Sequence, residues 1–118
     1  MLTAIALLTL AGHPQLNVYF QSNLTDTAYQ RKVFDRVAKG FVVPKARDFP
    51  KAGSKSVVRA VIGSDGKLVS AMVSMESGSK AWDAAALSSV TRAAPFPPLP
   101  KGFDAPTVEA DFHVTAGP

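Results

Sequence analysis

Ser77 and Lys80 have the spacing in this chain that most directly suggests catalysis. They form Ser-x-x-Lys at the predicted start of a helix, where penicillin-binding enzymes place a serine nucleophile one turn from a lysine base. The companion motifs are missing, because the sequence has no Lys-Thr-Gly and has Ser-Asp-Gly at 64–66 in a predicted turn. We interpret Ser77 and Lys80 as part of a turn and helix cap, and a small Ser/Lys hydrolase remains an alternative.

Other catalytic or metal-binding arrangements are not evident in the sequence. There is no cysteine, and the two histidines, His13 and His113, lie at opposite ends of the chain. No His, Asp or Glu group has metal-ligand spacing, and Gly-Ser-Asp-Gly at 63–66 lacks the spacing of a phosphate-binding loop. Asp65 and Asp83 are best explained as turn and helix-start residues. We therefore expect a protein that is not an enzyme and that has no cofactor.

The charge distribution argues against nucleic-acid binding. The 118 residues include 13 Lys and Arg and 9 Asp and Glu, for a net charge of +4. Basic residues recur on one flank of a predicted helix at 31, 32, 36 and 39. A nucleic-acid-binding surface would show a denser basic face with aromatic stacking platforms. We expect no nucleic-acid partner.

The first 23 residues differ from the rest, because they contain no charged side chain. Residues 1–11 are apolar and would span about 17 Å as a helix, against roughly 30 Å for a bilayer core. The run has the length of a signal-peptide core, but no Lys or Arg precedes it. Residues 17–23, Asn-Val-Tyr-Phe-Gln-Ser-Asn, resemble the protease site used to remove purification tags. We predict that 1–23 is a cloning-derived or signal-like segment outside the fold, and that the domain covers 24–118.

Helical and strand periodicities alternate through the remainder. The spacing predicts a first helix over 25–41, with Thr27 and Gln30 as a capping box. Two strands follow at 56–62 and 67–75, joined by an Asp-Gly turn. In the second strand we expect one shared face for Val69, Ala71, Val73 and Met75.

Ser79 is predicted to cap a second helix, which continues to about residue 94. A strand at 107–114 then completes an α+β fold of order α-β-β-α-β. We expect a small antiparallel three-stranded sheet with both helices packed on one face.

The last predicted strand has the clearest alternation in the chain. Its even-numbered residues are apolar and its odd-numbered residues are polar, which indicates one buried and one wet face. An edge strand offers unpaired backbone N–H and C=O groups to an extended peptide. We therefore predict a partner-binding edge made of Thr107, Val108, Glu109, Ala110, Asp111, Phe112, His113 and Val114.

A proline-rich passage, Ala-Ala-Pro-Phe-Pro-Pro-Leu-Pro at 93–100, links the second helix to the last strand. It contains Pro-x-x-Pro twice, which would suit a polyproline ligand for another protein. The better explanation is a stiff crossover, with Phe96 and Leu99 fixed to the core while the prolines restrict the backbone.

Taken in order, these motifs make the chain resemble the TonB C-terminal domain family over about residues 28–115. The resemblance rests on an Asp-Gly hairpin, a Ser-Gly turn, a hydrophobic-Asp pair that opens a helix, and a proline-rich crossover. The matching residues are Asp65, Gly66, Ser77, Gly78, Trp82, Asp83, Pro95, Phe96, Pro97, Pro98 and Pro100.

The resemblance implies the periplasmic domain of an energy transducer whose longer parent is anchored in the inner membrane. Its partners would be an outer-membrane TonB-dependent receptor and, through the parent segment, an inner-membrane motor complex that supplies proton-motive-force energy. A strand-exchanged homodimer is a further expectation for an exposed edge. A TolA-like envelope-integrity domain and a soluble interaction module of the same fold remain alternatives.

Overall fold

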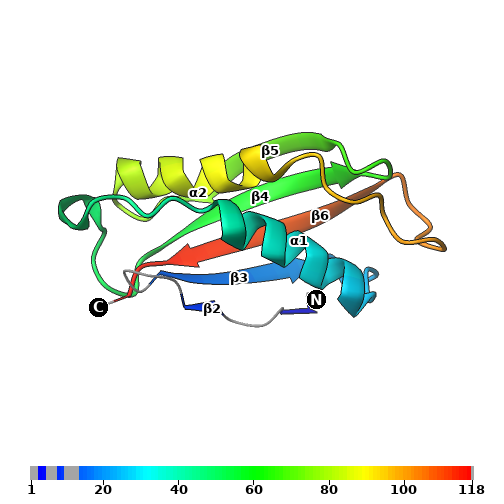
Figure 1. The fold of residues 1–118 in the computed structure, drawn as a ribbon, viewed down its shortest axis with the longest axis horizontal. Helices are drawn as coiled ribbons and strands as arrows, with labels where there is room; N and C mark the ends of the chain where they lie inside the picture. The colour runs from blue at the N-terminus through cyan, green and yellow to red at the C-terminus, as the bar shows by residue number, and fades with distance from the viewer. Residues whose placement is uncertain (1–2, 5–7, 10–13, 118) are drawn as a thin grey trace.

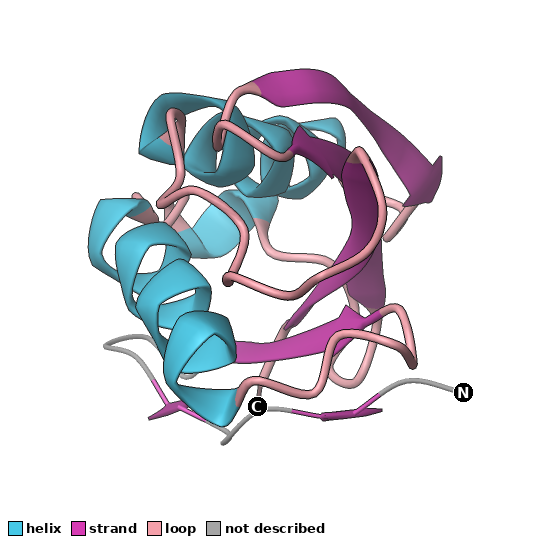
Figure 2. Cartoon of the chain, turned by 90° about the vertical axis from the view of Figure 1, so that its right-hand side faces the viewer, coloured by secondary structure: helices cyan, strands magenta, loops and turns pink. Residues whose placement is uncertain are grey.

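Two helices cover one face of an antiparallel sheet, and the other face of the sheet is open (Figure 1, Figure 2). The computed structural model describes residues 3–4, 8–9 and 14–117. This arrangement confirms the α+β class and the placement of both helices on one face. The elements, in chain order, are β1 (Thr3–Ala4), β2 (Leu8–Thr9), β3 (Gln15–Phe20), α1 (Thr27–Gly40), the 3-10 helix η1 (Ala46–Asp48), β4 (Lys55–Gly63), β5 (Leu68–Met75), α2 (Lys80–Ala93) and β6 (Thr107–Thr115).

The sheet contains one long strand more than the sequence pattern predicted. Its long strands lie in the order β3-β6-β4-β5, and the two-residue strands β1 and β2 both pair with β3. The three-strand prediction is wrong because β3 comes from the segment that we expected to lie outside the fold. His13 lies outside the described residues, as does the signal-like run at 1–11 apart from residues 3–4 and 8–9.

β3 joins the sheet because its side chains alternate between core and surface. Leu16, Val18 and Phe20 are buried, and Val18 and Phe20 have no exposed surface. Burying each such side chain contributes about 1.5–3 kcal/mol. The six residues pair with β6 from Gln15↔Thr115 to Phe20↔Ala110 without a register shift. Residues 15–20 are therefore part of the fold.

The cap of α1 differs from the predicted capping box. Asp26 is the N-cap, and its carboxylate accepts a hydrogen bond of 2.9 Å from the backbone N–H of Tyr29. Gln30 instead donates from Nε2 to the Leu24 carbonyl at 2.8 Å. Its amide is fully buried, so it ties the segment that leads out of β3 to the first turn of α1.

β5 departs from a uniform alternation because its pairing with β4 shifts register twice. The shifts fall between Val57 and Val58 and between Val61 and Ile62, and such bulges change which side chains share a face. Ala71 and Val73 pack against the core, whereas Val69 and Met75 are 62% and 51% exposed. The prediction that these four residues share one face is wrong.

α2 begins as predicted and carries the largest buried side chain. The Ser79 hydroxyl accepts a hydrogen bond of 3.1 Å from the Trp82 N–H. The Trp82 indole, fully buried, donates to the Val114 carbonyl at 3.0 Å and lies against the rings of Phe41 and Phe49. Trp82 thereby fixes α2 against β6.

Candidate functional site

β6 lies inside the sheet. It pairs with β4 over all nine of its residues and with β3 over Ala110–Thr115. Near the start of β6, the Gln21 N–H donates to the Glu109 carbonyl and the Glu109 N–H donates to the Gln21 side-chain Oε1, both at 3.0 Å. The prediction that 107–114 forms an open edge is wrong, because residues 15–21 of the same chain occupy that side. The predicted alternation is confirmed, with Val108, Ala110, Phe112 and Val114 buried.

The free long edge of the sheet is β5. In the described part of the chain, β5 pairs with β4 alone. Its eight residues, Leu-Val-Ser-Ala-Met-Val-Ser-Met, include no charged side chain and no proline. Natural edge strands are commonly protected by charged residues or proline, and β5 has neither protection.

Apolar side chains are exposed on this same strand. Val69, Met72 and Met75 are 62%, 58% and 51% exposed, and one other large hydrophobic residue, Val42, is comparably exposed among the described residues. Between the two register shifts, Ser70–Val73 pairs regularly with β4. An unpaired backbone edge and an apolar surface therefore coincide on β5, and we call this the β5 edge.

An ionic cluster lies at the centre of the open face, one strand in from the β5 edge. Arg59 on β4 contacts the carboxylates of Glu109 at 2.9 Å and Asp111 at 3.1 Å. These acidic neighbours raise the pKa of Arg59, chiefly through its hydrogen bond to Asp111. Both carboxylates are on β6, which flanks β4 on the side opposite β5, and Met72 on β5 is the cross-strand partner of Arg59.

On the side of β6 toward β3, the ring centroid of Tyr19 on β3 lies 4.6 Å from the ring centroid of His113 on β6. Burial lowers the pKa of His113, and the Lys55 charge lowers it further, against an opposing effect of Asp111. The sequence had suggested that His113 faces a free edge. In the structure it instead lies against the Tyr19 side chain of β3.

The proline-rich crossover is fixed to both the hairpin and α1. The Phe96 N–H donates to the Gly66 carbonyl at 2.8 Å, and the Leu99 N–H donates to the Ser64 carbonyl at 3.0 Å. The Tyr29 hydroxyl donates to the Pro97 carbonyl at 2.8 Å, and burial raises its pKa to about 12. These contacts support the interpretation of 93–100 as a stiff crossover.

Gly66 is required at the hairpin for two reasons. Its φ is +90°, a conformation that residues with a Cβ rarely adopt. A Cβ at this position would also collide with the Phe96 carbonyl. The Asp65 carboxylate completes the turn by accepting from the Lys67 N–H at 3.0 Å. The Asp-Gly pair thus supports the crossover that includes Pro95, Pro98 and Pro100.

The Ser-x-x-Lys residues form a local turn. The Ser77 hydroxyl donates to the Ser79 carbonyl at 3.2 Å and accepts from the Ser79 N–H at 3.1 Å. The Asp83 carboxylate accepts from the Ser77 N–H at 2.9 Å and from the Ser56 hydroxyl at 2.6 Å. Asp83 therefore ties the Ser77-Gly78 turn to β4, and Lys80 is exposed.

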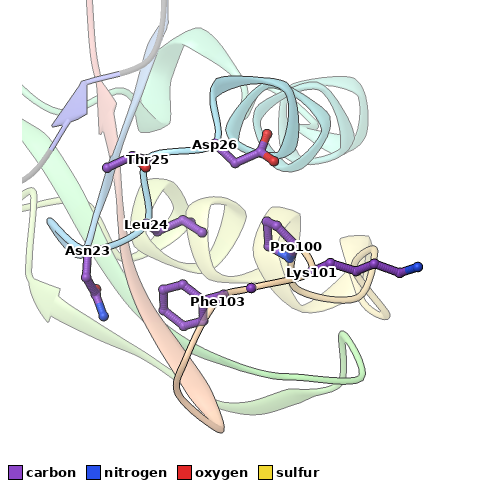
Figure 3. Close-up of a pocket in the computed structure, with 8 residues that line it drawn as sticks. Asn23, Leu24, Thr25, Asp26, Pro100, Lys101 and Phe103 are labelled. Atoms are coloured by element: carbon purple, nitrogen blue, oxygen red, sulfur yellow. The ribbon is translucent and has the colours of Figure 1, made fainter.

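A shallow hollow lies where β3 leads into α1. It has a volume of about 370 Å³ and is lined by two segments, Asn23–Asp26 and Pro100–Phe103. Figure 3 shows Leu24 and Phe103 on its two sides. Neither this hollow nor any other described part of the chain holds a group of three His, Cys, Asp or Glu residues suited to a metal ion. Among the described residues, no helix is long and apolar enough to span a bilayer.

Comparison with known proteins decides the family. Residues 26–112 match the family model described as TonB C terminal, which is more than half of the chain. The chain belongs to the TonB C-terminal family. No curated protein and no solved structure matches it. Domains of this family are periplasmic and act in energy transduction and receptor interaction in the cell envelope.

The TonB match begins at the N-cap of α1, after β3. Within residues 26–112 the order is α1, β4, β5, α2 and β6, which is the predicted α-β-β-α-β order. The strand that covers β6 comes from outside this range. Sequence reasoning missed it, although Leu16, Val18 and Phe20 alternate with polar or amphipathic residues, and that alternation was the available signal.

Proposed function

We propose that this TonB-type domain binds an extended segment of an outer-membrane receptor as an additional strand on the β5 edge. The observation that carries the proposal is the coincidence of an unpaired long strand with three exposed apolar side chains. Backbone hydrogen bonds would supply affinity, and side-chain contacts would supply selectivity. In this proposal the domain is a binding module and not an enzyme.

The chemistry of β5 defines the segment that would fit. An incoming strand places alternate side chains beside Met72 on the open face and beside Ala71 and Val73 on the helix face. No charged residue of β5 would pair with a charge on the partner. The partner segment is therefore neutral along the paired stretch and apolar on at least the open face.

Strand addition also suits the energy-transducing role proposed for the longer parent protein. A periplasmic domain linked to an inner-membrane motor complex has to transmit a pull to its receptor. Several backbone hydrogen bonds of a paired strand are loaded together when the pull is along the strand, whereas peeling loads them one after another. An edge strand of eight residues provides such a contact.

Lysine substitutions on β5 test the proposal. The probes are synthetic peptides from periplasm-facing segments of outer-membrane receptors, and binding is followed by fluorescence anisotropy. We expect Met72→Lys and Val69→Lys each to weaken binding about tenfold or more, since a charge replaces an apolar contact worth about 1.5–3 kcal/mol. Because both positions are exposed, stability should change by less than about 0.5 kcal/mol.

Val42→Lys is the matched control. Val42 and Val69 are equally exposed, at 62%, but Val42 lies in the segment after α1, beside Ala81 and Ala85 of α2. Its substitution should leave peptide binding unchanged. Equal binding by all three lysine variants and the unsubstituted chain would contradict a site on β5.

A further inference from the structure

A groove runs along the outer side of α2. One wall is the segment 42–48, which in Figure 1 runs back along α2 toward the N-terminal end of that helix. This part of the groove has a volume of about 450 Å³, and its α2 side consists of four residues at helical spacing, Ala81, Ala85, Ser88 and Arg92. Arg92 also lines an adjoining hollow of about 320 Å³ between the C-terminal ends of α1 and α2. We call the two hollows together the α2 groove.

The wall of the α2 groove is fixed to the start of α2. The Ser79 hydroxyl, which caps this helix, also donates to the Asp48 carbonyl of η1. The Phe49 ring packs against the buried Trp82 ring, with the two ring centroids 4.9 Å apart. The groove is therefore formed before a partner binds, and binding does not have to order its wall.

Two arginines join the C-terminal ends of the helices where the two hollows meet. Arg36 of α1 donates from Nε to the Ala93 carbonyl of α2 at 3.0 Å, and Arg92 of α2 donates from Nη2 to the Gly40 carbonyl of α1 at 2.9 Å. A guanidinium group has five N–H donors, so each arginine is held in place and keeps donors for a further acceptor. Carboxylates suit these donors because arginine binds them with two parallel hydrogen bonds.

Positive charge is concentrated in the α2 groove. Five of the 13 basic residues line it, against two of the nine acidic residues. One of these two, Asp35, already pairs with Arg31 at 3.3 Å, and the other is Asp48. Within the described part of the chain, ion pairs involve none of the five basic side chains. All five are exposed, and they are Arg36, Lys39, Lys45, Arg47 and Arg92.

From these observations we infer that the α2 groove binds an acidic segment of another protein. Clusters of arginine are a recurring means of recognising such segments. From Ala81 to Arg92 the α2 side of the groove is about 17 Å long, which corresponds to about five residues of extended chain. Carboxylates of the segment pair with the basic side chains, and an apolar side chain between them packs on Ala85 and Val42.

A protein segment suits the α2 groove better than a membrane surface does. The charges line a hollow that a flat bilayer surface does not enter, and the floor of the hollow includes small apolar side chains. The described residues that line the groove belong to no strand. The site is therefore separate from the β5 edge.

An acidic peptide and its neutral counterpart test the inference. The probe is fluorescein-labelled Glu-Leu-Glu-Glu-Leu-Glu, and the control peptide has glutamine in place of each glutamate. Binding to the full chain is followed by fluorescence anisotropy. We expect the acidic peptide to bind about tenfold or more tightly than the control, and its affinity to fall as the salt concentration rises. Equal binding of the two peptides would overturn the inference.

A double substitution in the wall of the groove locates the binding site. Lys45→Gln combined with Arg47→Gln should weaken binding of the acidic peptide about tenfold or more. Lys67→Gln combined with Lys101→Gln is the matched control, because it removes the same charge from exposed positions outside the groove. An equal loss for the two variants would indicate attraction by net charge alone and would overturn the inference.

Filling the floor of the groove is a test that leaves the charge unchanged. Ala85→Phe should weaken binding of the acidic peptide about tenfold or more, because the ring occupies the space between α2 and segment 42–48. Ala84→Phe is the control, since Ala84 is exposed on the same helix but does not line the groove. Circular dichroism verifies that both variants are folded. Unchanged binding by folded Ala85→Phe would contradict a site in the groove.

The variants of the proposed function separate the two sites. Met72→Lys should leave binding of the acidic peptide unchanged, because Met72 is on β5, whereas tighter binding would assign the peptide to the β5 edge and overturn the inference. Val42→Lys adds a positive charge to the α2 groove and should strengthen binding of the acidic peptide. Binding of the chain to phosphatidylglycerol vesicles without binding of the peptide would overturn the inference in favour of a membrane surface.

Discussion

Replacing Phe20 with alanine measures how much β3 contributes to the fold. Phe20 is the last residue of β3, is fully buried, and pairs with Ala110 on β6. If the segment before residue 24 were only an appendage, truncating this ring would cost nothing. If β3 is an integral strand, the substitution leaves a cavity between the sheet and the helices.

The expected loss follows from the burial of the ring. Phe→Ala substitutions in cores cost about 3–5 kcal/mol, from lost transfer free energy and from the cavity that remains. The small partner Ala110 cannot fill the space, so the upper half of this range is expected. For a domain of this size, each kcal/mol lowers the melting temperature by about 4–8 °C.

Urea unfolding followed by Trp82 fluorescence provides the assay, since the indole is buried and contacts β6. Asn17→Ala is the control, because Asn17 lies on the same strand but on the open face and should change stability by less than about 0.5 kcal/mol. A loss below about 1 kcal/mol for Phe20→Ala would refute the conclusion that β3 belongs to the core.

Three further predictions concern the hairpin, the Ser-Gly turn and the open face. Gly66→Ala should lower the free energy of unfolding by more than about 3 kcal/mol, because the alanine would have a left-handed conformation and its Cβ would collide with the Phe96 carbonyl. Gly53 has a similar φ of +89° but free space around it, so Gly53→Ala should cost only about 1–2 kcal/mol. Equal losses of stability for the two variants in thermal unfolding would contradict the collision. Asp83→Ala should cost about 1–3 kcal/mol, because two donors lose their acceptor, whereas Asp35→Ala, which removes an exposed ion pair, should cost under about 0.5 kcal/mol. Because burial lowers the pKa of His113 in the folded state, the unfolded state binds the proton more readily, so the free energy of unfolding should fall as pH decreases below about 6.5. His113→Asn should remove that part of the slope, and an unchanged pH profile would contradict the assignment.

Local patterns predicted most elements of this fold correctly. The buried stripe of α2, which includes Trp82, Ala86 and Val90, was evident from helical spacing. The alternation in β6 correctly separated core from surface. These features depend on residues close together in the chain, where periodicity carries the information.

The errors arose where distant segments or local irregularities decide the structure. Whether β6 is an edge depends on its pairing with residues 15–20, and nothing within 107–114 indicates that partner. Because residues 17–23 resemble a protease site, the segment that contains Leu16, Val18 and Phe20 was predicted to lie outside the fold despite its alternating pattern. The register shifts in β5 were likewise hidden, so Val69 and Met75 were predicted to share one face with Ala71 and Val73.

Backbone amide exchange on the β5 edge is the most direct test of the proposed function. The unsubstituted chain is compared with and without a bound receptor peptide, and protection is measured for each strand. Strand addition predicts new protection within Leu68–Met75 and little change in β3, which is already paired. Binding of the peptide with no added protection in β5 would contradict the proposal.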